Sequence, residues 1–222
     1  MLLRLIEASL IDMCPEFTMV SENPNILPPH EGIPPGWFSD RSWDLGDQIY
    51  RPIGESDLPE LMRWRNEQQD VLRQQEELTL SHQQRWFADV VVPSYQQTRP
   101  RSLQVIALRG DTRVSYGGLT NIEWVSRRAE LSFLVSTELT RSFESYAEEF
   151  HRFLDWTAAF AFDELCFNRI FAETWDFRDE HIRILEGFGF VLEGRLRQHV
   201  AKNGRTHDAL LHGLLAKNWG SR

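Results

Sequence analysis

The chain has 222 residues, a formal net charge of −9 and a sequence pI near 5.3. This acidic balance argues against a nucleic-acid-binding surface, because phosphate neutralisation requires clustered Lys and Arg. Apolar residues make up 41% of the chain, which is enough for a substantial core. The length allows one domain with an elaboration, or two small domains.

Residues 1–46 differ in composition from the rest. They are rich in proline, which interrupts helices and strands, so we expect an N-terminal extension at 1–46 and a main domain at 47–222. The aromatic residues of the extension would be costly to expose, so we expect them to pack on the core or on a second subunit, which leaves a homodimer open. Residues 1–13 are too short and too charged to span a bilayer. The two cysteines are too few for a disulfide framework and fit a reducing compartment, so we expect a soluble cytoplasmic protein with no membrane partner.

The period of the apolar residues predicts the first elements of the main domain. A strand over residues 48–53 stops at Gly54. Ser56 or Asp57 can cap a helix over residues 58–66. A second helix is predicted over residues 78–92, where apolar side chains recur at helical spacing.

Three strands then form a predicted antiparallel meander. They cover Leu103–Arg109, residues 113–124 and residues 129–136, with turn residues between them. Gly117 and Gly118 inside the second strand predict a bulge or a close approach of another backbone.

The C-terminal part is predicted to contain a long helix over residues 140–165 and a strand over 170–174. A shorter helix follows, capped by Asp179, with apolar positions on one face and glycines at its end. The last two strands, over residues 190–200 and 205–215, form a hairpin with a turn at Asn203-Gly204, because Asn-Gly is a strong hairpin signal.

This order of elements resembles the GNAT superfamily of acyl-CoA-dependent N-acyltransferases. The nearest resemblance is to the branch that holds the ribosomal-protein N-terminal acetyltransferases and the N-acetyltransferases of amino sugar nucleotides. It is carried by LMRWRN at 61–66, GGLTNI at 117–122, AELSF at 129–133, NRIFAE at 168–173, IRILEG at 182–187, GF at 189–190 and EG at 193–194. It covers residues 48–217 and implies an α/β (α+β) GNAT fold, with a central mixed, mostly antiparallel sheet flanked by helices.

The resemblance also implies chemistry. In this superfamily the fourth and fifth strands splay apart, and the acyl-CoA thioester lies near the fourth strand, so we expect Val135 and Ser136 to contact the donor. A base must keep the attacking amine neutral. Glu130 lies in an otherwise apolar strand and Glu173 near the end of another, and both are expected to be catalytic. A structural ion pair with an Arg is the alternative for Glu130.

The loop before the long helix departs from the family pattern. Relatives usually have Arg/Gln-x-x-Gly-x-Gly/Ala here, whose backbone N–H groups bind the pyrophosphate. Residues 138–148 contain no glycine, and Glu144 brings negative charge to the helix start. We expect Arg141, the local cation, to contact the donor together with Ser142 and Ser145.

The C-terminal helix departs from the pattern as well. By register against the glycine stop, Arg178 stands where relatives often have an Asn that touches CoA, and we expect it to contact the donor or to be a solvated residue. Leu185 stands where relatives often have a Tyr that acts as general acid, and a Leu cannot donate a proton. Tyr116 and Tyr146 remain open as substitute acids. His181 is interpreted as a helix-surface residue.

Four residues are expected to bind the acceptor: Trp64, Arg65, Asn66 and Asn121. For Trp64, plain core packing is the alternative. The histidines show no metal-ligand spacing, so no metal is predicted.

We therefore expect an N-acyltransferase that moves an acetyl or other acyl group from acyl-CoA to a primary amine. The acceptor would be a small molecule such as an amino sugar nucleotide. One alternative is a degenerate GNAT domain that takes its acyl group from a carrier protein or serves as a binding module. The other is a protein N-terminal acetyltransferase, because an acidic protein attracts basic peptides.

Overall fold

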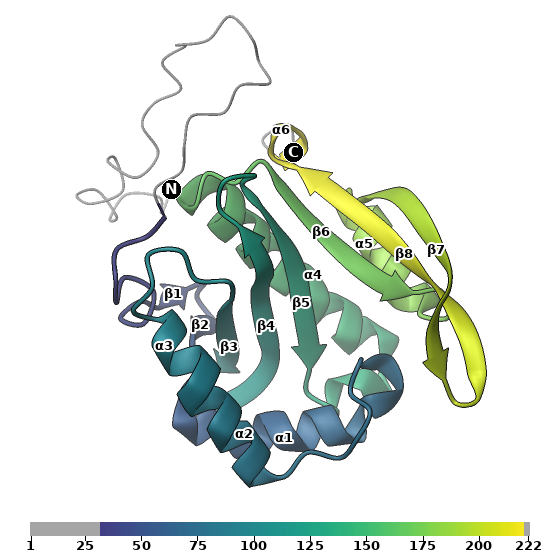
Figure 1. Cartoon of the computed structure of the whole chain (residues 1–222), viewed down its shortest axis with the longest axis horizontal. Coiled ribbons are helices and arrows are strands. Elements are labelled where there is room, and N and C mark those ends of the chain that lie inside the picture. The colour runs from purple at the N-terminus through teal and green to yellow at the C-terminus, as the bar shows by residue number, and fades with distance from the viewer. Residues whose placement is uncertain (1–31, 220–222) are drawn as a thin grey trace, which may run out of the picture.

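The computed structural model describes residues 32–219, which fold around one eight-stranded sheet (Figure 1). The strand order is β1-β2-β3-β4-β5-β6-β8-β7. All neighbouring strands are antiparallel except β5 and β6, which are parallel. The bounds are β1 Trp43–Asp44, β2 Ile49–Pro52, β3 Leu103–Arg109, β4 Thr112–Glu123, β5 Arg128–Val135, β6 Arg169–Trp175, β7 Val191–Lys202 and β8 Arg205–Leu215.

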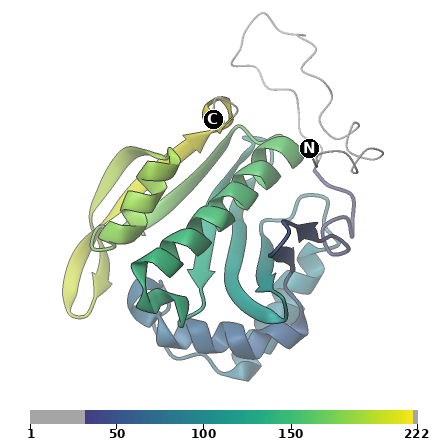
Figure 2. The same ribbon diagram turned by 180° about the vertical axis from the view of Figure 1, so that it is seen from behind.

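Helices cover both faces of this sheet. They are α1 Leu58–Glu67, α2 Leu80–Trp86, α3 Val92–Ser94, α4 Phe143–Ala159, α5 Asp179–Phe188 and α6 Ala216–Trp219. Shorter turns are η1 Glu55–Asp57, η2 Gln69–Val71 and η4 Leu139–Arg141, with π-helical turns η3 Phe87–Val91 and η5 Phe160–Glu164. Figures 1 and 2 show α2 and α3 on one face and α4 and α5 on the other. Within residues 32–219, no helix has the length and apolar character needed to cross a membrane.

The two faces of the sheet carry separate apolar clusters. Ile106 of β3 and Tyr116 of β4 pack with Trp64 of α1. Val105 of β3 belongs to the other cluster, together with Phe153 of α4. The alternation follows from strand geometry, in which successive side chains point to opposite faces. The sheet is therefore a rigid scaffold for residues at its strand ends.

The described part of the N-terminal region packs on the core. Phe38 is fully buried, and the Trp43 ring lies 5.4 Å from that of Trp156. Trp43 Nε1 donates a hydrogen bond of 2.7 Å to Glu164. Because β1 belongs to the sheet, the sheet begins before residue 47, where the main domain was expected to start. The expectations for residues 1–31 fall outside the described residues.

The predicted fold class is confirmed, and β3 and β8 match their predicted bounds. The meander and the Asn203-Gly204 hairpin are also present. A Cβ atom on Gly117 would meet the Ser132 carbonyl, so the close-approach interpretation of the paired glycines holds there.

Other local expectations need correction. The long helix α4 begins at Phe143, not at residue 140, because a 3₁₀ turn precedes it. The N-cap of α5 is Arg178 instead of Asp179, and Gly189, at φ 107°, ends the helix alone. Cys166 is disulfide-bonded, which differs from the expectation of reduced cysteines.

Candidate functional site

The main cleft lies where β5 and β6 separate. The two strands pair only through residues 128–130 of β5 and 169–171 of β6, and then diverge. The space beyond has a volume of about 240 Å³. It is lined by Arg65, Val71, Leu72, Arg73, Thr120, Asn121, Glu130, Leu131, Ser132, Phe133, Ala172, Glu173, Thr174, Trp175, Arg178 and His181. Figure 1 shows this separation at the end of the sheet next to α1.

Glu130 and Glu173, the two predicted catalytic residues, are brought together here. Each alternates with buried neighbours in its strand, so both side chains leave the same face of the sheet. The Glu130 side chain is 12% exposed and that of Glu173 is 17% exposed. Both contact Nη2 of Arg73, at 3.2 Å from Glu130 Oε1 and 3.0 Å from Glu173 Oε1. The structural alternative, an ion pair with an Arg, thus describes an observed contact of Glu130.

Asn121, a predicted acceptor-binding residue, lies beside this pair. It has a left-handed φ of 47°, at a point where the β4–β5 register shifts. Its Nδ2 donates a hydrogen bond of 2.5 Å to Glu130 Oε2. The bulge thereby directs an amide into the cleft and fixes one oxygen of Glu130, which leaves the other facing Arg73.

The three predicted acceptor residues of α1 occupy different environments. Trp64 is fully buried in the apolar cluster, so the core-packing alternative describes it and its ring offers no face to a ligand. Arg65 lines the cleft, and its positive charge acts on the nearby Tyr116 hydroxyl. Asn66 instead holds the loop between α1 and α2, because its Oδ1 accepts from Leu78 N and its Nδ2 donates to the Leu78 carbonyl, each at 2.8 Å.

The edge of β5 that faces the cleft bears unpaired backbone groups. Ser136 N donates to Val114 O of β4, so strand alternation turns the backbone groups of Val135 and Phe133 away from β4. The Val135 carbonyl accepts a hydrogen bond of 2.9 Å from Gln68 Nε2. Val135 and Ser136, both predicted to contact the donor, are buried and already hydrogen-bonded through the backbone, so the Phe133 peptide remains for a ligand amide.

At the start of α4, residues of the helix itself hydrogen-bond to the groups that a ligand would use. Ser142 caps the helix by accepting from Ser145 N at 3.3 Å, and its hydroxyl donates to Glu144 at 2.7 Å. This hydrogen bond and the helix start lower the pKa of Glu144, which therefore stays ionised. Arg141 is exposed beside it. The predicted donor residues Arg141, Ser142 and Ser145 thus gather at one helix start, where a carboxylate is also fixed.

A partly buried polar cluster joins α4 to α5 beside the cleft. Tyr146 Oη lies 2.6 Å from His181 Nδ1, and Arg178 Nη2 lies 3.3 Å from Tyr146 Oη and 3.4 Å from His181 Nδ1. The His181 ring stacks on Phe150, with 4.3 Å between centroids. The interpretation of His181 as a surface residue is wrong, because its side chain is buried.

Burial determines the charge states of this cluster. It lowers the pKa of His181 well below the usual value, with further contributions from the charges of Arg178 and His212, so the ring is neutral near pH 7. Burial also raises the pKa of Tyr146, which keeps its proton. Tyr146 therefore donates to Nδ1, and the proton of the neutral ring resides on Nε2. Within residues 32–219, no hydrogen-bond partner is found for Nε2, and the residue lines the cleft.

Two features of the site were missed by reasoning from sequence. Arg73 lies in an irregular loop where periodicity carries no information. The burial of His181 could have been found, because it precedes Leu185 by one helical turn and so shares its buried face. Within the described residues, no group of three potential metal ligands is found.

Comparisons with known proteins agree with this architecture. Residues 51–211 match the family model described as an acetyltransferase (GNAT) domain. A spermidine N-acetyltransferase from Vibrio cholerae, solved with CoA and spermine, has a TM-score of 0.69 at 15% identity, over 78% of this chain and 98% of that one. The dodecameric form of the Vibrio cholerae enzyme in an intermediate state has a TM-score of 0.65 at 15% identity, over 78% of this chain and 96% of that one.

At these identities the solved structures establish the fold alone. A search of curated proteins finds no match. The family model, however, covers well over half of the chain, from the end of β2 through most of β8, with every residue that lines the cleft. The chain therefore belongs to the GNAT acetyltransferase family.

Proposed function

We propose that this protein transfers an acetyl group from acetyl-CoA to a primary amine of a small molecule bound in the cleft between β5 and β6. The observation that carries the proposal is the convergence of Glu130 and Glu173 at the point where these strands separate. Two carboxylates at this position would bind an ammonium ion, and one of them would take its proton. A neutral amine is required before attack on a thioester carbonyl.

The donor would lie along the open edge of β5. An extended chain that contains amide groups can add to a free strand edge through backbone hydrogen bonds, as the pantetheine arm of CoA would do at Phe133. A backbone N–H on this edge can also stabilise the oxyanion that forms when the amine attacks. Arg178 and Arg141 are the cations that would face the anionic part of the donor.

Glu130 is the proposed base, acting directly or through a water molecule. Asn121 holds one of its oxygens, and the other points to the position of Arg73. In the acid step, His181 would donate the Nε2 proton to the departing sulfur. Tyr146 positions this ring through Nδ1 and can pass its own proton to that nitrogen, with Arg178 beside the resulting phenolate. The proton lost by the amine balances the one gained by the thiol.

The acceptor is proposed to be a small amine for two reasons. Solved spermidine N-acetyltransferases share this fold, and the cleft is of small-molecule size. Arg65 makes no ion pair within residues 32–219 and could bind a phosphate of the acceptor. An amino sugar nucleotide fits this combination of a carboxylate pair and a nearby cation.

A second candidate differs in the donor. The fixed Glu144 and the engaged Ser142 hydroxyl oppose a pyrophosphate at the start of α4. An acyl group on the phosphopantetheine arm of a carrier protein lacks the adenosine part of CoA, so it would avoid this position. In this case the site on β5 would serve a carrier.

The test is a thiol-release assay with acetyl-CoA and a panel of amines: spermidine, an amino sugar nucleotide and a basic peptide with a free N-terminus. Acetyl-CoA at about 100 times its dissociation constant should stabilise the protein by about 2.7 kcal/mol. Thiol release with a small amine supports the proposal. An absence of both thermal stabilisation and thiol release argues for the carrier-dependent alternative, which acetyl-loaded carrier protein would then test.

A further inference from the structure

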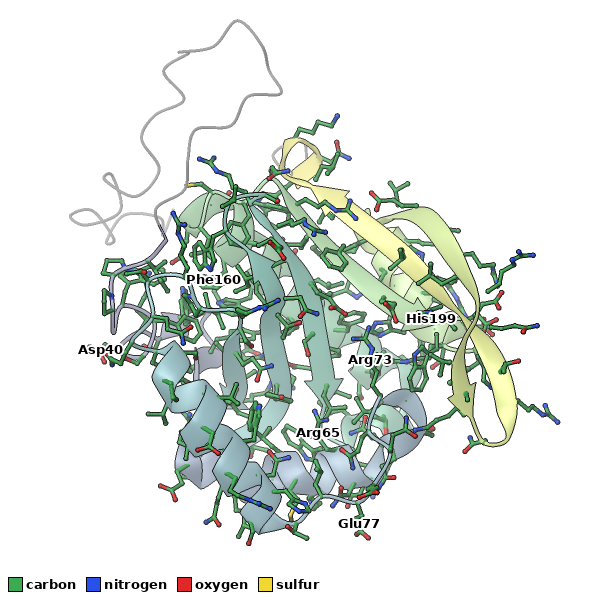
Figure 3. The ribbon with its side chains drawn as sticks, viewed as in Figure 1. Asp40, Arg65, Arg73, Glu77, Phe160 and His199 are labelled. Atoms are coloured by element: carbon green, nitrogen blue, oxygen red, sulfur yellow. The ribbon has the colours of Figure 1, made fainter. Side chains whose placement is uncertain are left out.

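Arg73 is the cation that satisfies the two proposed catalytic carboxylates. Its Nη2 atom alone contacts both Glu130 and Glu173, at 3.2 and 3.0 Å. The Arg73 side chain is 58% exposed, whereas the carboxylates are mostly buried. The guanidinium thus enters the cleft from outside, between β5 and the β7–β8 hairpin (Figure 3).

The backbone around Arg73 is anchored on both sides. Lys202, at the tip of the β7–β8 hairpin, donates to the carbonyl of Leu72 at 3.1 Å and to that of Gln74 at 3.2 Å. Gln74 also donates to Asn66 Oδ1 at 2.8 Å. The loop between α1 and α2 is therefore fixed at both neighbours of Arg73. Only the Arg73 side chain has to rotate to open the space between the carboxylates.

The charges around this point explain why a cation resides there. Two nearby carboxylates repel each other, and a cation between them removes the repulsion. His199 Nε2 lies 3.7 Å from Glu173 Oε1, and Asn121 donates to Glu130, but Arg73 is the only permanent cation among the described residues that touches either carboxylate. Ion pairs made by an exposed Arg side chain are individually weak, so another cation can replace it.

We propose that Arg73 occupies the ammonium subsite of the acceptor, and that a cationic amine binds by displacing its guanidinium from Glu130 and Glu173. The inference rests on the proposed function for the identity of the acceptor site. A primary amine reaches the protein as an ammonium ion near pH 7 and needs the same two oxygens that now face Arg73. Arg73 therefore selects for cationic acceptors that can compete with it, and its side chain marks the route of entry.

The test compares Arg73→Gln with the unchanged protein, using spermidine as the probe. Calorimetric titration of spermidine should give a dissociation constant roughly tenfold lower for Arg73→Gln, because two weak ion pairs no longer compete. Combining Arg73→Gln with Glu130→Gln and Glu173→Gln should remove that gain. In turnover, Arg73→Gln should lower the acceptor KM and leave kcat within about twofold. Aniline, which is neutral at pH 7, should show no change in KM.

Arg195→Gln is the matched control. Arg195 is also half exposed and also faces two carboxylates, Asp176 at 3.6 Å and Asp208 at 2.8 Å, but it lies outside the cleft lining. Its substitution should leave spermidine affinity unchanged. Weaker or unaltered spermidine binding by a folded Arg73→Gln variant, judged by its thermal midpoint, overturns the inference. Tighter spermidine binding by Arg73→Gln, without thiol release from acetyl-CoA with any amine, would support the cation subsite and refute acetyl transfer from acetyl-CoA.

Discussion

The two halves of the cleft differ in how their polar side chains are paired. On the proposed acceptor side, Glu130 and Glu173 pair with an exposed Arg73, and water or another cation can replace such ion pairs. On the proposed donor side, the partly buried Tyr146 and the buried His181 are neutral and share a hydrogen bond of 2.6 Å, and the His181 ring stacks on Phe150. The ion pairs on the proposed acceptor side can therefore be exchanged for those of another cation, whereas the hydrogen bond on the proposed donor side keeps a fixed geometry.

Substitution on the acceptor side should have the largest effect. Glu130→Gln keeps the shape and the contact with Asn121 but removes the proposed base. We expect kcat/KM for a small amine to fall about 10²- to 10³-fold, as for loss of general base catalysis. Steady-state thiol release measures this change, and the loss should be smaller at high pH, where more amine is already neutral.

Glu123→Gln is the control for this change. Glu123 lies at the end of β4, is exposed and does not line the cleft. It should retain full activity. Equal activity of Glu130→Gln and Glu123→Gln would show that Glu130 is not the base and serves only as a structural partner of Arg73.

Substitution on the proposed donor side should have a smaller effect on activity, and the effect should appear in kcat. Tyr146→Phe removes the shorter of the two contacts to the buried His181 Nδ1 and leaves only Arg178 at 3.4 Å, so the ring is held less firmly in its tautomer. A lost buried hydrogen bond of this kind costs about 1–3 kcal/mol, which corresponds to an about 5- to 160-fold lower kcat if the ring acts in the acid step. The acceptor KM should not change. Single-turnover kinetics with acetyl-CoA separate this effect from binding.

Tyr116→Phe distinguishes the two tyrosines left open by the sequence. Tyr116 Oη donates a hydrogen bond of 3.3 Å to Gln104 Oε1, and Tyr116 lies in the apolar cluster that contains Trp64 of α1. Its loss should reduce stability slightly and leave kcat unaltered. A larger kcat effect at Tyr116 than at Tyr146 would reverse the assignment.

The fold was predictable because its signals are local. Leu103–Arg109 has the two-residue period of a strand. Asn203 and Gly204 adopt the positive φ values, 51° and 72°, that a tight hairpin turn needs. Glu130 stood out because it interrupts an apolar strand. These inferences need only the residues within one element.

The remaining parts of the site depend on contacts between distant residues. Arg73 meets Glu130 across 57 residues, and Tyr146 meets His181 across 35. No periodicity encodes either pair. Trp64 shows the converse difficulty, because an aromatic residue on an amphipathic helix fits a core and a ligand site equally well, and only the packed structure shows it fully buried.

The charge state of the donor side predicts a dependence of stability on pH. The folded protein holds the pKa of His181 well below 6.5, so below pH 6.5 the unfolded chain takes up a proton that the folded state does not. This group therefore contributes less stability as pH falls. Between pH 7.5 and 5.5 the loss should be about 1.4 kcal/mol, measured by urea unfolding.

The double variant Tyr146→Phe with His181→Phe isolates this contribution. It replaces both hydrogen-bonding partners by apolar rings and preserves the stack on Phe150, which can be nearly neutral at pH 7.5. The variant should lose about 1.4 kcal/mol less than the unchanged protein over the same pH range. His151→Gln, an exposed position on α4, should behave like the unchanged protein. A parallel fall in stability for the double variant would mean that His181 titrates normally.

The smallest effect is expected at the start of α4, where the two donor hypotheses diverge. Glu144 is held by Ser142 at the positive end of the helix dipole, where a phosphate of CoA would also bind. If CoA binds there, Glu144→Gln should lower the dissociation constant of acetyl-CoA about two- to fivefold at low ionic strength, and the gain should shrink in 0.5 M salt. Glu148→Gln, one turn further along and paired with Arg152 at 3.2 Å, should change it less. Calorimetry at two salt concentrations measures both. If Glu144→Gln leaves the affinity unaltered at low salt, the pyrophosphate does not lie at this helix start, and the arm of a carrier protein becomes the better donor for the open edge of β5.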